Sequence, residues 1–171
     1  MREPHRLATY AVTAAMAGRT HLEVARAAIA GGATTVQLRA PELDPAARTR
    51  IASELAADCR AAGVLAIVND DVEAARAAGA ERIVGVGVGA PAGAAGAAPP
   101  RLGAERILGV CVGSPAEAAV AASAGADYLG VTVWATPTKP EARPAGLAGV
   151  AATDLPVVGI GGIDARNAAR T

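Results

Sequence analysis

The chain has 171 residues, the length of one domain that can bury about 70% of the surface its unfolded chain would expose. Sixteen basic and sixteen acidic side chains cancel, and no run of Lys or Arg provides the surface that binds nucleic acids or anionic membranes. Two Tyr, one Trp and no Phe leave few aromatic anchors for bases or for a protein partner. We therefore expect small-molecule ligands, no nucleic-acid partner and no membrane partner.

The cysteines and the apolar content indicate the compartment. Cys59 and Cys111 form no C-x-x-C motif, and no basic leader precedes an apolar segment at the amino end. Apolar residues make up 52% of the chain, but they are mainly Ala and Val in short runs. None of these runs approaches the ~20 continuous apolar residues of a membrane span. We expect a cytoplasmic protein.

Short runs rich in Val and Ile alternate with Ala-rich stretches of helical length. This alternation is typical of βα units around a parallel sheet. Strands are expected at residues 7–13, 34–40, 64–70, 82–88, 106–112, 127–134 and 156–163. Helices are expected at residues 21–30, 44–62, 71–78 and 114–124.

Three of the helical stretches end in a similar glycine-containing phrase. The phrases are Ala30-Gly31-Gly32-Ala33, Ala78-Gly79-Ala80-Glu81 and Ala124-Gly125-Ala126-Asp127. Glycine lets the chain leave a helix through a left-handed residue before the next strand begins. The repeated phrase therefore indicates a repeated βα unit, although residues 89–100 are almost entirely Ala, Gly and Pro and predict a loop in place of one helix.

The order of elements predicts one α/β domain over residues 1–171, a TIM-type (β/α) barrel. A closed barrel of this type has eight strands, whereas only seven are predicted here, followed by the start of a helix at residues 164–171. We therefore expect a barrel without its eighth βα unit, either because that unit is absent or because the chain is a fragment. Open strand edges predict self-association into a homo-oligomer.

Candidate site residues lie at the carboxyl ends of the predicted strands, where such barrels carry their active sites. Arg39 ends the second strand and can hold a phosphate through two parallel hydrogen bonds. Gln37 points to the same side, because side chains alternate along a strand. The alternative for Arg39 is a structural pair with an acidic neighbour.

The third strand ends in Asn69 and Asp70. These residues offer oxygen ligands to Mg²⁺, which takes few carboxylates and completes its shell with substrate phosphates. The alternative is a helix cap, made by Asp70 or by Asp71. The sequence leaves both interpretations open.

Two later segments are suited to phosphate. Thr136, Thr138 and Lys139 supply two hydroxyls and an ammonium on a Pro-stiffened loop, although this loop could also be a solvated turn. Gly161 and Gly162 would let backbone amides approach an anion ahead of a helix.

The remaining candidate side chains are expected to have no chemical role. Cys111 ends the fifth strand, and nothing near it in the sequence would lower its pKa, so a packing role is expected. His5 and His21 are expected to face solvent.

In chain order, these phrases resemble the thiamine phosphate synthase and thiazole tautomerase superfamily. The most specific part runs from Ala124 to Ile163, with the phrases GADYLG, TPTKP and PVVGIGGI in sequence. The other matching phrases are Val36-Gln37-Leu38-Arg39, Ile67-Val68-Asn69-Asp70, Ala78-Gly79-Ala80 and Leu108-Gly109-Val110.

The resemblance implies the condensation of hydroxymethylpyrimidine diphosphate with thiazole phosphate, with Mg²⁺ as cofactor and diphosphate as leaving group. It also implies a role for each matching residue, with Arg39 and Lys139 acting in catalysis. The pyrimidine diphosphate would be bound by Gln37, Arg39, Asn69 and Lys139, Mg²⁺ by Asp70, and the thiazole phosphate by Thr136, Thr138 and the backbone of Gly162.

The chain also departs from the family pattern at several positions. Pro41 stands where the family has Lys, Asp71 where it has Arg, Cys111 where it has Ser, and Gly113 where the tautomerase branch has His. The segment Val84–Val88 and the glycine after it provide no second carboxylate for metal. Each lost charge contact can cost about 3 kcal/mol of transition-state stabilisation. The alternatives to a synthase are a noncatalytic paralogue that binds a phosphorylated ligand and a thiazole tautomerase-like protein.

Overall fold

A computed structural model describes residues 4–14, 18–78, 84–88, 107–134, 153–164 and 166–168. Contacts divide the chain into two compact units. The first comprises Met1–Gly87 with Leu102–Ile107, and the second comprises Val88–Arg101 with Leu108–Thr171. The expectation of a single domain over residues 1–171 stays a prediction.

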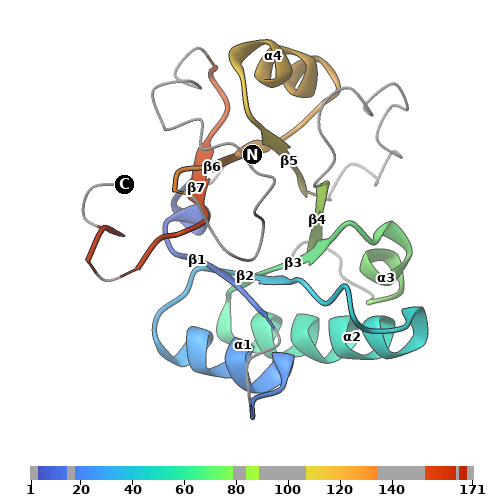
Figure 1. Cartoon of the computed structure of the whole chain (residues 1–171). Helices are drawn as coiled ribbons and strands as arrows, with labels where there is room; N and C mark the ends of the chain where they lie inside the picture. The colour runs from blue at the N-terminus through green and yellow to red at the C-terminus, as the bar shows by residue number, and fades with distance from the viewer. Residues whose placement is uncertain are drawn as a thin grey trace. The chain divides into compact units, whose positions relative to one another are not determined.

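The first unit alternates strands and helices (Figure 1). All strands and helices expected in it are present, but the first strand is shorter than predicted, because Leu7 belongs to a 3₁₀ turn. Its described elements are η1 (Pro4–Leu7), β1 (Tyr10–Val12), α1 (His21–Ala30), β2 (Thr35–Leu38), α2 (Pro45–Ala62), β3 (Leu65–Asn69), α3 (Val72–Ala77) and β4 (Val84–Val88).

The strands of the first unit are parallel and pair in chain order. Val12 of β1 stands beside Gln37 of β2, and Gln37 stands beside Ile67 of β3. Ile67 in turn stands beside Gly85 of β4. The carboxyl ends of neighbouring strands therefore meet at the same edge of the sheet.

The core of the first unit lies between its strands and helices. Strand β2 is buried at every position and β3 at its first four, as expected when both faces of a parallel strand are covered. In α2, the buried residues Ala52, Leu55, Ala56 and Cys59 recur at the spacing of a single helix face. Burial raises the pKa of the Cys59 thiol to about 12, so this cysteine is an apolar packing group.

Polar caps define where the helices begin. Thr20 and Glu23 form a capping box at the start of α1, and Asp44 accepts a hydrogen bond from the Ala47 N–H at the start of α2. The predicted left-handed glycines are present in two of the repeated phrases, at Gly32 (φ +88°) and Gly125 (φ +88°). Gly79, in the third phrase, lies outside the described residues.

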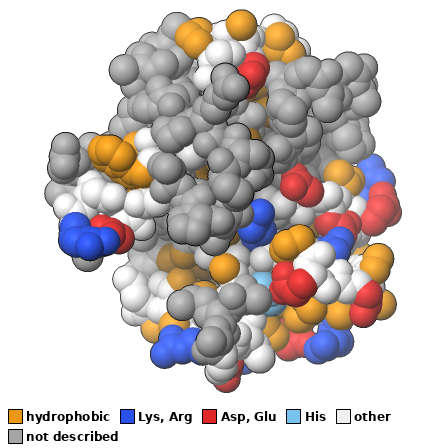
Figure 2. Space-filling view, in the orientation of Figure 1, with side chains coloured by type: hydrophobic (Ala, Val, Ile, Leu, Met, Phe, Trp, Pro, Cys, Tyr) orange, Lys and Arg blue, Asp and Glu red, His pale blue; other side chains and the backbone are white. Residues whose placement is uncertain are grey.

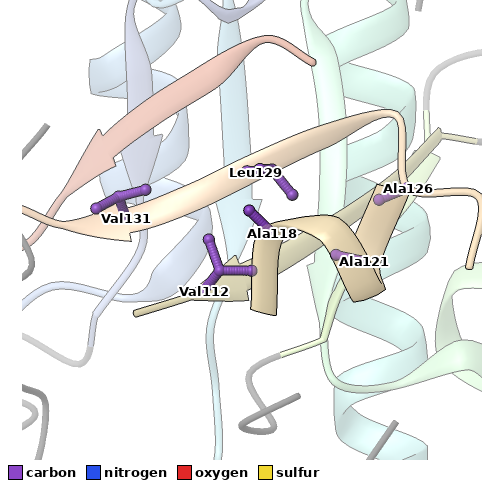
Figure 3. Packing of buried hydrophobic residues seen from close by; sticks show 6 residues of the cluster. All are labelled: Val112, Ala118, Ala121, Ala126, Leu129 and Val131. Carbon is purple, nitrogen blue, oxygen red and sulfur yellow. The ribbon is translucent and has the colours of Figure 1, made fainter. Parts of the chain in front are cut away.

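The second unit contains β5 (Ile107–Val112), α4 (Pro115–Ser123), β6 (Tyr128–Thr132) and β7 (Val157–Ile160) among its described residues. Strand β6 pairs in parallel with β5 and with β7. Helix α4 covers β5 and β6 with small side chains, as Figure 3 shows. This buried cluster consists of Val112, Ala118, Ala121, Ala126, Leu129 and Val131.

Two glycines of the second unit allow close side-chain approach. The Tyr128 ring lies over Gly109, where a Cβ would overlap it. A Cβ on Gly130 would stand 3.2 Å from the Cys111 Sγ and 3.5 Å from the Ile160 Cδ1. Cys111 therefore packs against its neighbouring strand, in agreement with the role expected for it.

The described surface carries charges of both signs. In Figure 2, acidic and basic side chains are interspersed over the part of the first unit that holds α2 and α3. Among the described residues, no helix is both long enough and apolar enough to cross a membrane.

Replacing Gly109 with Ala tests the close approach of Tyr128. We expect Gly109→Ala to lower the free energy of unfolding by about 2 kcal/mol, because the buried Tyr128 ring must move from its packed position. Urea denaturation measures the change. Gly113→Ala is the matched control, because its Cβ would meet only the Glu117 Oε2, at 3.6 Å. Equal stability of the two variants would contradict the packing described here.

Candidate functional site

The candidate site begins at the carboxyl edge of the first unit, where three neighbouring strands end in polar residues. Thr13 follows β1, Arg39 follows β2, and Asn69 is the last residue of β3. The Thr13 N–H donates to the Gln37 carbonyl at 2.9 Å, which continues the pairing of β1 with β2. Parallel pairing thus brings together residues that are far apart in the sequence.

Gln37 is buried within β2, with 7% of its surface exposed. Its Nε2 donates to the Tyr10 hydroxyl of β1 at 3.1 Å. The structure therefore gives Gln37 a partner on the neighbouring strand, and its contact with a substrate stays a prediction.

Arg39 is half-buried. Its backbone N–H donates to the Thr13 Oγ1 at 3.1 Å. Within the part of the chain that the structure describes, no hydrogen bond or ion pair holds the Arg39 guanidinium. The structural pair considered as an alternative for Arg39 is therefore not found among these residues, and the guanidinium can bind an anion.

Asn69 and Asp70 form a small hydrogen-bonded pair. The Asn69 Nδ2 donates to the Asp70 Oδ2 at 2.7 Å. Asp70 is exposed and has a left-handed backbone with φ +56°, a conformation that Asp and Asn tolerate better than most residues. The cap of α3 is Asp71, whose Oδ1 accepts the Ala74 N–H at 2.8 Å. Capping of α3 is thus the role of Asp71 and not of Asp70.

The donor set at this edge is compatible with Mg²⁺. Asp70 offers a carboxylate, and Asn69 keeps its amide oxygen as a second ligand. The described residues contain no group of three or more His, Cys, Asp or Glu side chains that could hold a metal alone. Mg²⁺ needs no such group when substrate phosphates and water complete its shell.

Arg48 of α2 was not singled out from the sequence, and it occupies the region between the ends of β2 and β3. Its Nη1 lies 2.7 Å from the Asp71 Oδ2, and its Nη2 donates to the Leu43 carbonyl at 2.6 Å. Both charged side chains are mostly buried, with 22% of Arg48 and 16% of Asp71 exposed. Arg48 therefore neutralises the acidic residue that stands where the family has Arg.

The pKa of Asp71 is lowered by these contacts. Burial alone would raise it, but the hydrogen bonds from the Ala74 N–H and from Arg48 stabilise the charged form and bring the pKa below its usual value. The sequence carries no local signal for this pair, because only the fold shows that Asp71 is mostly buried. The 23-residue separation gives no indication of which of the basic residues is its partner.

The expectation that His21 faces solvent is wrong. His21 is the first residue of α1, yet only 6% of it is exposed. Its Nδ1 lies 3.0 Å from the Thr13 Oγ1, and its Nε2 lies 2.5 Å from the Glu42 Oε1. These partners come from the segments after β1 and β2 and enclose the ring. His5 is exposed, as expected.

In the second unit, the turn after β7 contains the predicted glycine pair. Gly161 (φ +90°) and Gly162 (φ +63°) are both left-handed, a conformation that favours glycine. The Asn167 Nδ2 donates to the Gly162 carbonyl at 2.8 Å and stabilises the turn. Thr136, Thr138 and Lys139 lie outside the described residues.

The fold and the site define an α/β protein with parallel strands and with phosphate- and metal-binding residue types at neighbouring strand ends. A model of the family described as thiamine monophosphate synthase matches residues 9–171. The thiamine-phosphate synthase of Methanoregula boonei is 41% identical over 172 residues, covering 96% of this chain and 78% of that protein. That of Chloroflexus aurantiacus is 44% identical over 158 residues, covering 89% and 71%.

A solved structure agrees with the sequence comparison. The thiamine phosphate pyrophosphorylase from Pyrococcus furiosus superposes with a TM-score of 0.79 at 33% identity, covering 96% of this chain and 80% of that one. The chain belongs to the thiamine monophosphate synthase family, which confirms the resemblance seen in its motifs.

The ion pair between Arg48 and Asp71 is tested by Asp71→Asn, which keeps the capping oxygen and removes the charge. We expect the free energy of unfolding to fall by about 2 kcal/mol at neutral pH, because Arg48 keeps a mostly buried charge without its carboxylate. Because the folded-state pKa of Asp71 is lowered, its contribution is present above the usual Asp pKa and is lost as pH falls through the lowered value. The difference between wild type and variant should therefore shrink on acidification.

Urea denaturation over a pH series measures this effect. Asp44→Asn is the matched control, because Asp44 caps α2 and makes no ion pair with another described residue. It should change stability by less than about 0.5 kcal/mol. A pH-independent cost of Asp71→Asn would contradict the ion pair.

Proposed function

We propose that this chain is a thiamine-phosphate synthase that condenses hydroxymethylpyrimidine diphosphate with thiazole phosphate. The observation that carries the proposal is the position of Arg39, Asn69 and Asp70 at neighbouring ends of the parallel strands β2 and β3. Thiamine-phosphate synthases that are 41% and 44% identical to this chain support it.

The reaction requires the protein to stabilise a diphosphate as it leaves. The bond between the pyrimidine methylene carbon and the diphosphate oxygen breaks, and its electron pair leaves with the diphosphate. The thiazole nitrogen then uses its lone pair to form the new carbon–nitrogen bond. Negative charge grows on the leaving oxygens, so cationic groups fixed beside them lower the barrier.

The first unit would bind the pyrimidine diphosphate. The Arg39 guanidinium, which has no hydrogen bond or ion pair to any of the described residues, would bind two phosphate oxygens. Asp70 would hold Mg²⁺, which supplies charge neutralisation at the diphosphate when bound, and Asn69 would orient that carboxylate through its 2.7 Å hydrogen bond. Gln37 would contact the substrate from its buried place on β2.

The remaining site residues belong to the same proposal. Thr136 and Thr138 would bind the thiazole phosphate, and Lys139 would meet the leaving diphosphate. The left-handed turn at Gly162 would present backbone to the thiazole phosphate.

The finer assignments are also proposals. A (β/α) barrel fold is supported by the likeness to the Pyrococcus furiosus protein, which covers 96% of this chain. A cytoplasmic location accords with a family that makes thiamine phosphate, and self-association stays a prediction from the open strand edges.

A second function is a protein that binds a phosphorylated ligand without catalysis. The observation in its favour is the segment Val84–Val88, which provides no second carboxylate for the metal. Pro41 and Asp71 add to it, because each replaces a cation of the family pattern. The neutralisation of Asp71 by Arg48 weakens this argument, since no net negative charge is added there.

The decisive experiment is formation of thiamine phosphate from both substrates in the presence of Mg²⁺. We expect product from the wild type and a loss of about 100-fold in kcat/KM for Asp70→Asn and for Arg39→Ala. Asn keeps the left-handed backbone at position 70, so the variant should fold.

Matched controls separate charge loss at the site from charge loss elsewhere. Arg50→Ala removes an exposed guanidinium from α2, and Asp58→Asn removes a carboxylate from the same helix. Both should keep activity within about twofold of the wild type. A folded wild type that binds the pyrimidine diphosphate and forms no product would favour the noncatalytic function.

A further inference from the structure

His21 is a buried imidazole that the proposed chemistry does not use. It starts α1, and the neighbouring Thr20 and Glu23 already satisfy the end of that helix through the capping box. The His21 ring therefore does not cap the helix, and it contacts two other segments instead. One of these follows β1 and the other follows β2.

The His21 ring makes a hydrogen bond through each of its two nitrogens. Glu42 is a carboxylate, and the hydrogen bond from His21 holds the pKa of Glu42 below its usual value. A carboxylate only accepts, so the Nε2 of His21 carries the hydrogen in this 2.5 Å contact. The Nδ1 of the same ring lies 3.0 Å from the Thr13 Oγ1, so the His21 side chain links Glu42 to Thr13.

Thr13 links the His21 ring to the backbone of Arg39, because its Oγ1 contacts both. A regular parallel ladder between β1 and β2 would continue from the Arg39 N–H to the main-chain carbonyl of Thr13. Here the Arg39 N–H donates to the Thr13 Oγ1 instead, at 3.1 Å. The Thr13 side chain is 1% exposed, so the position of the Arg39 backbone depends on a side chain that His21 orients.

Glu42 belongs to the same short segment as Arg39. It follows Arg39 by three residues, and the Arg39 charge is among the causes that lower the pKa of Glu42. A carboxylate this close could accept hydrogen bonds from the guanidinium and remove it from the site. The hydrogen bond from His21 to the Glu42 Oε1 fixes the orientation of this carboxylate, which makes no ion pair with Arg39 among the described residues.

We propose that His21 is a positioning residue that holds Thr13, which contacts the Arg39 backbone, and Glu42, which follows Arg39 by three residues, so that the Arg39 guanidinium stays available to a phosphorylated substrate. The identity of that substrate rests on the proposed function. The hydrogen bonds that join Glu42, His21, Thr13 and Arg39 are independent of the proposed function.

The test compares three variants for KM and kcat with the pyrimidine diphosphate. His21→Ala should raise KM about tenfold, because the guanidinium becomes a partner of Glu42, and should change kcat less. The double variant His21→Ala with Glu42→Gln should bring KM back to within about threefold of the wild type, because a neutral amide competes weakly for the guanidinium. Glu42→Gln alone is the second single variant and completes a double-mutant cycle.

Thr20→Ala is the matched control for stability. It removes the cap next to His21, weakens α1 by about 1 kcal/mol, and leaves the contacts of Thr13 and Glu42 in place. Its KM should equal that of the wild type. A folded His21→Ala protein with unchanged KM, or a double variant no better than the single one, would overturn the positioning role.

Two readouts do not require turnover. Calorimetry with inorganic pyrophosphate and Mg²⁺ should show that the wild type and the double variant bind pyrophosphate more tightly than His21→Ala does. The imidazole ¹⁵N shifts of His21 should report a hydrogen on Nε2. If the wild type forms no thiamine phosphate but the order of pyrophosphate affinities holds, the proposed function fails and the role of His21 stands. If pyrophosphate does not bind to the wild type, both fail.

Discussion

Parallel pairing of β1, β2 and β3 is the constraint on which the candidate site depends. It aligns Val12 with Gln37 and Gln37 with Ile67, and it therefore ends all three strands at one edge. The helices cover the strands with apolar side chains, so the polar residues of the strands are concentrated where each strand ends. A shift of one residue in this register would reverse the direction of every side chain in the affected strand and would separate Arg39 from Asn69.

Two side chains at this edge make polar contacts that join different loops. Arg48 joins the segment after β2 to Asp71 at the start of α3, and His21 joins the segments after β1 and β2. Both residues are on helices. The segments that carry Arg39 and Asp70 are thus each linked to a helix by side-chain hydrogen bonds.

The sequence predicted the fold more completely than the site. Runs of Val and Ile located the described strands, and glycines such as Gly125 marked the helix ends, because both signals are local. Asp70 and Asp71 could not be assigned separately, since either can cap a helix. The structure separates them because only Asp71 accepts the Ala74 N–H.

His21 and Arg48 could not be assigned from the sequence for a physical reason. A histidine at the start of a helix faces solvent unless another segment covers it, and here Glu42 covers it from 21 residues away. The same applies to Arg48, whose partner lies 23 residues further along the chain. Such pairs depend on the tertiary fold, and the residues themselves are common types with no local pattern.

We propose that the strand ends of the first unit bind a diphosphate together with Mg²⁺. Calorimetric titration of the wild-type chain with hydroxymethylpyrimidine diphosphate, with and without Mg²⁺, measures this binding. We expect the affinity to rise by at least about tenfold when Mg²⁺ is present, because Asp70 and the diphosphate would share the ion. If the folded protein binds the ligand equally well without Mg²⁺, or does not bind it at all, the strand ends do not form this site.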